Sequence, residues 1–242
     1  MKHLLPFKNK NQEDSYWLTI SDLMSGLMIV FLFISISFMR YTQIEKDKVA
    51  IERDKIKNIA VAYQENQVEI YNALNDEFIN DLPKWNASID KHTLSFQFNA
   101  PEVLFDIGKS NVNIKFQNIL SDFIPRYLAV LSNYKNSIDE IRIEGHTSSE
   151  WRYKTSEDKA YFYNMQLSQE RTRSVLEYAY NIKKINNEQR QWIKEKFAAV
   201  GFSSSKIIKD ISGSEDKERS RRVTFRVITN ADIQIKKIIE SM

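Results

Sequence analysis

Hydrophobic residues are spread unevenly along the chain, and their most continuous run lies near the N-terminus. Residues 23–39 contain no charged side chain, and extending the run back to Trp17 adds one ionisable group, Asp22. At about 1.5 Å per residue, a helix of this length crosses a hydrocarbon core of roughly 30 Å. Trp17 and Tyr41 stand at its two ends, where interfacial aromatic residues are expected. The pattern therefore predicts a transmembrane helix over residues 17–41.

The residues that flank this helix predict its orientation. The preceding segment, 1–16, carries three lysines, and short flanks rich in Lys face the cytoplasm. The run ends in the bulky or charged residues 38–41 and not in the small residues of a signal-peptide cleavage site, which predicts an anchor that stays attached. We expect a single-pass membrane protein with a cytoplasmic tail at 1–16 and with everything after Tyr41 in the periplasm.

The one carboxylate in this run, Asp22, has two interpretations. An ionised carboxylate that faces lipid costs on the order of 2.5 to 3.5 kcal/mol, so the side chain should face protein or water. It could lie harmlessly at the headgroup boundary, or it could be a protonatable ion carrier in a bundle of helices. Ser21, Ser25 and Gly26 favour the second interpretation, because small and hydroxyl-bearing residues allow close helix packing and can hydrogen-bond a carboxyl group.

A region dense in charge follows the apolar run. From Arg40 to Leu82 the sequence has neither Gly nor Pro. Its apolar residues recur at a spacing close to the 3.5-residue repeat of a helical seam. They are Ile56, Ile59, Tyr63, Ile70, Leu74 and Phe78. A weak coiled coil and a single amphipathic helix lying on a neighbouring surface both fit this spacing. We expect a periplasmic helical stalk or linker over 42–91, with Pro83 ending the helix.

From residue 92 onward the pattern changes to short strands that alternate with helices. Alternating apolar and polar residues predict strands at 93–98, 141–145, 197–202 and 222–228. Helix-spaced apolar residues predict helices at 112–131 and 167–180, the first of them bent or restarted at Pro125. The predicted fold class is α+β, an α/β sandwich with helices on one face of a small mixed sheet, over residues 92–230. Residues 231–242 are expected to form a short C-terminal amphipathic helix.

Composition narrows the chemistry. The chain of 242 residues has 35 Lys and Arg against 32 Asp and Glu, and this net charge of +3 does not indicate a nucleic-acid-binding surface. The absence of Cys excludes disulfides, Cys-ligated zinc and thiol nucleophiles. No catalytic triad order, Gly-rich phosphate loop or metal-ligand spacing is present. We expect no enzyme, no metal, no cofactor and no direct nucleic-acid partner, and His146 is interpreted as a structural residue at a strand end.

The segment from Trp17 to Met28, with the sequence WLTISDLMSGLM, resembles the transmembrane helix of MotB-type stator subunits. In that family a Trp stands five residues before the Asp that carries the translocated ion. The resemblance therefore implies that Asp22 is the residue that carries a proton or a sodium ion, with a proton preferred.

Residues from about 94 to 229 resemble the OmpA-like peptidoglycan-binding domain. The matching residues follow the family's order and are Phe105 and Gly108, Gly145-His146-Thr147, Asn164, Leu167-Ser168, Arg171, Gly201 and Ser220-Arg221-Arg222-Val223. The chain has only five glycines, and three of them fall at glycine positions of the family. The resemblance implies the mixed sheet predicted above and a domain that binds the cell wall.

The same resemblance implies a peptidoglycan-binding site on one helix. Tyr163, Asn164, Leu167 and Arg171 share a helix face. Leu167 and Arg171 follow Tyr163 by four and eight residues, and follow Asn164 by three and seven. A guanidinium presents a rigid fork that suits a carboxylate, and Asn offers both donors and an acceptor to a peptide. In the family, the corresponding Asn and Arg help to hold the diaminopimelate-containing stem peptide. Outside this context Arg171 would be interpreted as a solvated charge and Asn164 as a helix N-cap, and Leu167 is expected to pack.

The chain departs from the family at one position of this site. The family usually has an Asp after Gly-His-Thr, and that Asp takes part in gripping the amino group of the stem peptide, whereas this chain has Ser148. The change removes a charge-assisted hydrogen bond. Either wall binding is weaker, or Glu150 or another acid substitutes. Arg221 and Arg222 are expected to brace the last strand through ion pairs, with no ligand assigned to them.

The stretches 143–151 and 164–169 resemble the ZorB subunits of Zorya anti-phage systems more than flagellar subunits. That resemblance implies an inner-membrane, ion-driven complex that is anchored to peptidoglycan. It also implies two copies of such a chain, a homodimer, inside five copies of a ZorA-like membrane subunit, with ion flow linked to defence. Two alternatives remain: a flagellar-type MotB stator subunit, and a passive OmpA-like envelope anchor through which no ion moves.

Overall fold

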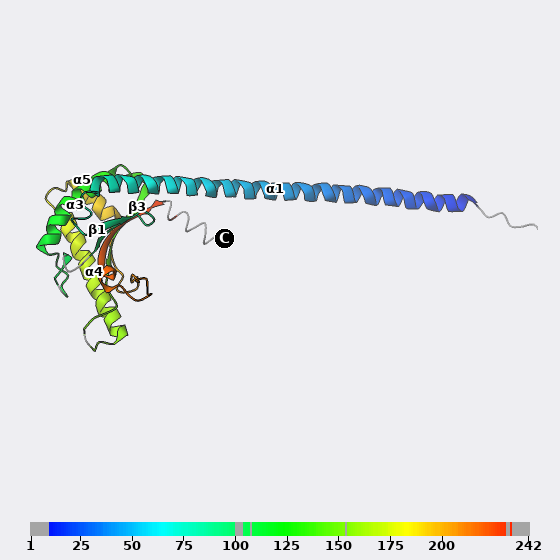
Figure 1. The fold of residues 1–242 in the computed structure, drawn as a ribbon. Helices are drawn as coiled ribbons and strands as arrows, with labels where there is room; N and C mark the ends of the chain where they lie inside the picture. The colour runs from blue at the N-terminus through cyan, green and yellow to red at the C-terminus, as the bar shows by residue number, and fades with distance from the viewer. Residues whose placement is uncertain (1–9, 100–103, 107, 153, 231–232, 234–242) are drawn as a thin grey trace, which may run out of the picture. The chain divides into compact units, whose positions relative to one another are not determined.

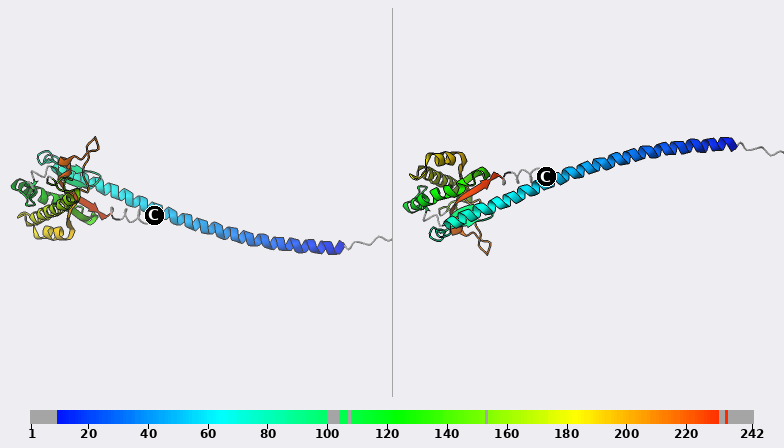
Figure 2. Two further views of the ribbon diagram at one scale, coloured as in Figure 1. Left: turned by 90° about the horizontal axis from the view of Figure 1, so that it is seen from below. Right: turned by 90° about the horizontal axis from the view of Figure 1, so that it is seen from above.

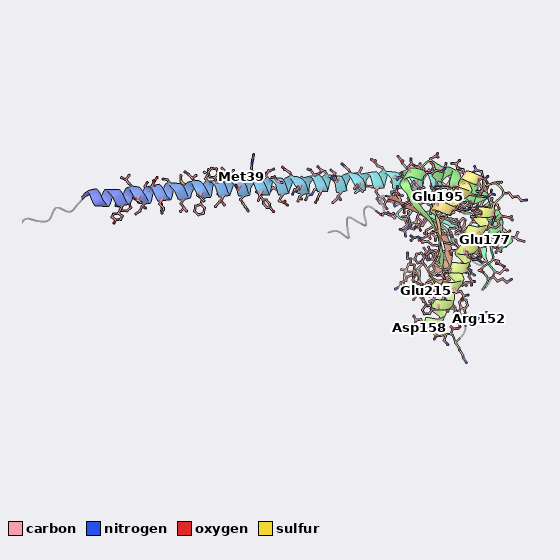
Figure 3. The ribbon with its side chains drawn as sticks, turned by 180° about the vertical axis from the view of Figure 1, so that it is seen from behind. Met39, Arg152, Asp158, Glu177, Glu195 and Glu215 are labelled. Atoms are coloured by element: carbon pink, nitrogen blue, oxygen red, sulfur yellow. The ribbon has the colours of Figure 1, made fainter. Side chains whose placement is uncertain are left out.

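The computed structural model describes residues 10–99, 104–106, 108–152, 154–230 and 233 of the chain. It divides into two compact units, Met1–Lys57 and Asn58–Met242, each considered by itself. In the first unit the described residues belong to helix α1, which spans Lys10–Phe78 (Figure 1). The apolar side chains of this part, such as Met39, point outward from the helix (Figure 3). By length and composition, the helix from Tyr16 to Phe78 could cross a membrane.

The second unit is built on a five-stranded mixed sheet in the order β1-β2-β5-β3-β4. The strands are β1 (Ala87–Asp90), β2 (Ser95–Asn99), β3 (Ile138–His146), β4 (Phe197–Gly201) and β5 (Arg222–Thr229). Strands β3 and β4 are parallel, and the other neighbours pair antiparallel. The parallel pair requires a crossover, and helices α4 and α5 supply it.

Three helices cover one face of this sheet (Figures 1 and 2). They are α3 (Ile114–Ser132), α4 (Glu157–Asn181) and α5 (Asn187–Lys196). Two shorter helical segments, η1 (Lys135–Ser137) and α6 (Lys217–Ser220), lie in connections. The side chain of Asn113 caps α3 by accepting from the backbone N–H of Phe116 at 2.9 Å. Asn186 and Gln189 form a reciprocal capping box at the start of α5.

The core is dominated by phenylalanine. The ring of Phe123, on α3, lies 4.6 Å from that of Phe96 and 5.1 to 5.3 Å from those of Phe78, Phe98 and Phe225. All five side chains have no exposed surface. Tilted and edge-on ring pairs at these distances each add about 0.5 to 1.5 kcal/mol beyond the burial of area. The cluster joins α1, α3 and the sheet into one core.

The last turns of α1 belong to this core. Ile70, Leu74 and Phe78 are fully buried on one face of the helix, as expected for an amphipathic helix that lies on a neighbouring surface. Arg126 on α3 donates from Nε to Glu77 at 2.6 Å and lies over the ring of Phe78, with its Cζ 4.7 Å from the ring centre. Residues 58–91 of the expected stalk therefore belong to the second unit, and Ile70, Leu74 and Phe78 among them lie in its core.

The predicted fold class is confirmed, and the differences concern ends and connections. Helix α4 begins at Glu157 and not at residue 167, since its polar first turns gave no apolar period. Helix α3 continues through Pro125 without a break, and α1 ends at Phe78, before Pro83, where the N–H of Leu82 turns back to the carbonyl of Phe78. The sequence did not predict β1 or α5. Almost all of the expected C-terminal helix, 231–242, and most of the expected tail, 1–16, lie outside the described residues.

Truncation of α1 side chains tests this packing. We expect Leu74→Ala to lower the free energy of unfolding by about 2 to 5 kcal/mol, because Leu74 is fully buried. Val68 is on the same helix but half exposed, so Val68→Ala should lower the free energy of unfolding by less than about 1 kcal/mol. Urea denaturation of the detergent-solubilised chain, followed by tryptophan fluorescence, measures both. Equal effects of the two variants would contradict the placement of these turns in the core.

Candidate ligand-binding site

A cavity of about 330 Å³ lies beside the first half of α4. Its walls come from α4, from the loop that follows β3, from the segment before α3 and from the junction of α6 and β5. The lining residues are Phe105, Gly108, Thr147, Ser148, Glu150, Trp151, Arg152, Asn164, Leu167, Arg171 and Arg221. In Figure 3 the labels of Arg152 and Asp158 mark the end of α4 near which the cavity lies, and Glu177 marks the other end.

Two glycines allow α4 to lie directly on the strands β3 and β4. A Cβ atom at Gly145 would come within 2.8 Å of the carbonyl oxygen of Ser168, and one at Gly201 within 2.5 Å of the backbone nitrogen of Gln169. Both distances are too short for a real Cβ, so any larger residue would push the helix away. The hydroxyl of Ser168 uses this proximity to accept from the backbone N–H of Ser203 at 3.1 Å. The position of α4 is thereby fixed relative to the ends of the strands.

Asn164 holds the loop that follows β3. Asn164 lies on α4 and is buried. Its Nδ2 donates to the backbone carbonyls of Ser148 at 3.1 Å and of Glu150 at 3.0 Å. In the described part of the chain its side-chain carbonyl oxygen accepts no hydrogen bond, and the residue lines the cavity. Asn164 therefore shapes one wall and leaves one acceptor for a ligand. It lies inside α4, seven residues after the first residue Glu157, and the N-cap is Ser156.

Arg171 places a guanidinium in the opposite wall. Its Nε donates to the carbonyl of Lys109 at 3.0 Å, and its Cζ lies 4.8 Å from the centre of the Phe105 ring. Burial, together with the positive charge of Arg221, lowers the pKa of Arg171 to about 10. Within the described residues no carboxylate pairs with it. A partly buried cation in this state favours an anionic ligand, because a carboxylate would offset the cost of its desolvation.

The other two predicted residues lie at the same place. Leu167 lines the cavity between Asn164 and Arg171 on α4. Tyr163 is half exposed, and its ring lies 5.4 Å from the ring of Trp151, which lines the cavity. The structure therefore brings the four predicted side chains together around one cavity, with Tyr163 at its rim.

The loop itself is held from several sides. The N–H of Thr147 donates to the carbonyl of Ser203 at 2.9 Å, and the N–H of Ser149 donates to the carboxylate of Glu215 at 2.9 Å. The carboxylate of Glu150 pairs with Lys217. Ser148, at the position of the family's Asp, is buried and lines the cavity. A fixed loop presents its side chains in one arrangement, as a binding site needs.

His146, the last residue of β3, is buried behind this loop. Its Nε2 lies 3.4 Å from a carboxylate oxygen of Glu144, and its ring stacks on Phe202 with centres 5.3 Å apart. Burial lowers the pKa of His146 below its ordinary value, with Arg222 and Lys206 acting in the same direction. His146 does not line the cavity, in agreement with a structural role.

Sequence reasoning did not assign four residues to the cavity. Phe105 and Arg221 were noted only as family positions, and Trp151 and Arg152 were not singled out, because their approach depends on how distant segments fold together. Arg221 lines the cavity and donates from Nε to the carbonyl of Lys217 at 3.0 Å. The described hydrogen bonds of Arg222 go to backbone carbonyls, among them that of Ser220 at 3.1 Å, and not to the expected carboxylates.

Asp22 lies in the first unit, on the apolar part of α1. Close to Asp22 on the helix, the hydroxyl of Ser25 donates to the backbone carbonyl of Ser21 at 2.8 Å. This hydroxyl therefore has a hydrogen-bond acceptor within its own helix. Leu18, Leu23 and Ile20 around it have large exposed surfaces in the single chain. Such a surface needs lipid or other helices to cover it.

Comparisons with known proteins agree with this arrangement. Residues 104–221, which include the cavity lining, match the OmpA family. The "Zorya protein ZorB" of Escherichia coli strain Crooks is 55% identical over 231 residues, which cover 96% of this chain and 95% of that protein. A second "Zorya protein ZorB", from another Escherichia coli strain, is 25% identical and aligns with 91% of this chain and 82% of its own length.

Among solved structures, a putative MotB like protein from Desulfovibrio vulgaris is similar to this chain with a TM-score of 0.47. It is 20% identical, and the match covers 71% of this chain and 94% of that one. A likeness of this degree says nothing about function.

The buried histidine makes stability depend on pH. Because its pKa is lowered in the folded state, the folded protein binds fewer protons than the unfolded chain near the ordinary value of 6.5. The contribution of His146 to the free energy of unfolding is therefore fully present above that pH, and it is lost as the pH falls towards the lower pKa of the folded state. We expect the free energy of unfolding to fall from about pH 6.5 towards pH 5, and less steeply in His146→Gln.

Urea denaturation at a series of pH values measures this slope. His92→Gln is the matched control, since His92 is exposed, and it should keep the slope of the original chain. An unchanged slope in His146→Gln would show that another group causes the dependence.

Proposed function

The chain belongs to the family of the Zorya protein ZorB, and from this premise we propose that it is a peptidoglycan-anchored subunit of an ion-driven inner-membrane complex acting in anti-phage defence. The second unit would bind the cell wall, and α1 would cross the membrane with its N-terminus in the cytoplasm. The observation that carries the wall-binding part is the guanidinium of Arg171, which lines a cavity and has no carboxylate partner among the described residues.

The ligand of the cavity is proposed to be the stem peptide of peptidoglycan. Its carboxylate would meet the guanidinium of Arg171 in a bidentate pair, which Lys could not reproduce. Its amide groups would meet the free acceptor of Asn164, and Leu167 with the exposed ring of Tyr163 would pack against its apolar part. Binding of a small peptide in such a cavity needs no motion of α4, because the glycine contacts already fix the helix.

Asp22 is proposed to carry the translocated ion, a proton in preference to sodium. The support is the MotB-like motif around it and its position in an apolar run whose side chains are exposed in the single chain. Placing an ionised carboxylate in the membrane costs free energy, so such residues usually have a function. Each elementary charge that crosses the membrane releases about 2.3 kcal/mol per 100 mV. That work would be passed to partner helices.

The exposed apolar surface of α1 also supports the proposed partners. A single chain leaves the side chains around Asp22 uncovered, so further helices are required to build an ion path. We propose a homodimer of this chain surrounded by a ZorA-like membrane subunit, in a ratio of two to five. The chain acts as a stator and anchor, not as an enzyme.

The ion-carrier role predicts the outcome of one conservative change. Asp22→Asn keeps the size of the side chain but cannot be deprotonated, so we expect it to abolish protection at normal membrane abundance. Phage plating efficiency on cells that express the chain with its genomic neighbours measures this. Asp47→Asn, an exposed carboxylate on the same helix, should protect fully. Full protection by Asp22→Asn would instead support a passive anchor, and rescue of swimming in a stator-deficient strain would support a flagellar subunit.

The wall-binding role predicts the effect of removing the guanidinium. Arg171→Ala should weaken binding to purified peptidoglycan by about 10-fold to 100-fold, the range for a lost charged hydrogen bond. Arg171→Lys should restore only part of it, because Lys lacks the planar fork. Arg173→Ala is the control, since Arg173 is exposed on the same helix. Co-sedimentation with cell-wall sacculi measures binding, and undiminished binding of Arg171→Ala would contradict the assignment.

A further inference from the structure

The loop that follows β3 supplies much of the cavity wall. Thr147, Ser148, Glu150 and Trp151 all line the cavity. Asn164 on α4, which lines it as well, donates from Nδ2 to the backbone carbonyls of Ser148 and Glu150. The shape of this wall therefore depends on how the backbone of the loop is held.

Glu215, labelled in Figure 3, holds the middle of this loop. One carboxylate oxygen of Glu215 accepts from the backbone N–H of Ser149 at 2.9 Å, and the other accepts from the hydroxyl of Ser149. Hydrogen bonds to a carboxylate are stronger than those between neutral groups. Neither Glu215 nor Ser149 lines the cavity, although both chain neighbours of Ser149 do. Glu215 is therefore placed to act on the cavity through the loop and not by touching a ligand.

A tight hairpin presents Glu215 to the loop. Lys209 and Glu215 form an antiparallel bridge, and the N–H of Asp210 donates to the carbonyl of Ser214 at 2.8 Å. The carboxylate of Asp210 accepts from the backbone N–H groups of Ser212 at 2.8 Å and of Ser214 at 3.1 Å. An Asp side chain that bonds the backbone two residues on stabilises a turn. These bonds restrict the positions open to the backbone of Glu215.

The base of this hairpin is tied to the start of β5. The N–H of Ile208 donates to the hydroxyl of Ser220 at 2.8 Å, and the N–H of Asp216 donates to the carbonyl of Ile208 at 2.8 Å. Ser220 is fully buried and ends α6, just before β5 begins at Arg222. A continuous set of hydrogen bonds thus connects β5, the hairpin and Ser149. Contiguous contacts of this kind let a residue outside a site affect it.

The middle of the loop would be freer without Glu215. Ser149 is exposed, so water would take the place of the carboxylate at its N–H. The other bonds from the second unit to the loop engage its neighbours: Thr147 donates to Ser203, and Glu150 pairs with Lys217. A ligand that must order a loop on binding loses affinity, because the loop gives up conformational entropy. A loop that is fixed in advance avoids this loss.

We propose that Glu215 is a positioning residue for ligand binding. Its carboxylate fixes the loop at Ser149, so that Ser148 and Glu150 on either side present one arrangement to the peptide. This rests on the proposed function, because the ligand is the stem peptide named there. It adds to the residues that determine affinity one that lies outside the cavity.

Removal of the carboxylate tests the proposal on the full chain in detergent. Glu215→Ala should weaken binding of the tripeptide L-Ala, γ-D-Glu and meso-diaminopimelate by about 10-fold, as measured by titration calorimetry. Glu215→Gln keeps an acceptor oxygen at the same reach, so its affinity should stay within about threefold of the original. Glu218→Ala is the control, since it removes an exposed acid of α6, and it should bind like the original chain.

Hydrogen exchange separates positioning from a general loss of stability. In Glu215→Ala the amides of residues 147–151 should exchange faster, whereas those of β3 and β5 should keep their rates, because only the loop is released. Mass spectrometry of proteolytic peptides measures both regions. Faster exchange throughout the domain, or unchanged exchange in the loop, would overturn the positioning role.

Ser149 completes a double-mutant cycle with Glu215. Ser149→Ala removes one of the two hydrogen bonds and keeps the backbone N–H. The double variant should bind the tripeptide no more weakly than Glu215→Ala alone, because the hydroxyl acts through the same carboxylate. Losses that simply add would contradict this dependence.

Arg171→Ala distinguishes this proposal from the proposed function. If Arg171→Ala weakens binding of the tripeptide while Glu215→Ala does not, the positioning role is wrong and the wall ligand stands. If the original chain does not bind the tripeptide, the proposed wall ligand fails, and the role of Glu215 fails with it.

Discussion

The site depends on one steric constraint, the direct contact of α4 with the strands β3 and β4. Gly145 and Gly201 leave room for the helix backbone where any side chain would collide. From this contact the rest follows: Asn164 comes within reach of the loop after β3, and Arg171 comes to lie over Phe105. The contact is made inside a domain whose phenylalanine core already fixes the sheet and α3, so the cavity is held open by rigid elements and not by loops alone.

A charged side chain in the cavity lowers the stability of the unliganded domain and favours the binding of an anion. The partly buried guanidinium of Arg171 has no carboxylate partner among the described residues, and its desolvation raises the free energy of the unliganded domain. A ligand that supplies a carboxylate would offset this cost. The guanidinium of Arg171 therefore marks this end of α4 as the place where the chain is proposed to meet its ligand, whereas His146 lies behind the loop and does not line the cavity.

Sequence alone predicted the helix face at Tyr163, Asn164, Leu167 and Arg171, because periodicity decides which side chains share a face. It could not predict Phe105, Trp151 and Arg221 as neighbours of that face, because their approach depends on contacts between distant segments. Likewise, the apolar spacing at Ile70, Leu74 and Phe78 predicted a helix face that packs on another surface, but it did not identify that surface. The folded core shows that the surface is formed by the sheet and α3. Strand β1 is short and polar, and its pairing with β2 decides its structure.

The central claim is that the cavity beside α4 receives a peptide carboxylate at the guanidinium of Arg171. A crystal structure of the full chain bound to the tripeptide L-Ala, γ-D-Glu and meso-diaminopimelate tests it most directly. The account predicts a ligand carboxylate at about 3 Å from the guanidinium of Arg171, with an amide N–H of the peptide at a similar distance from the side-chain carbonyl oxygen of Asn164. A peptide bound elsewhere on the domain, or one whose carboxylate points away from Arg171 into solvent, would contradict it.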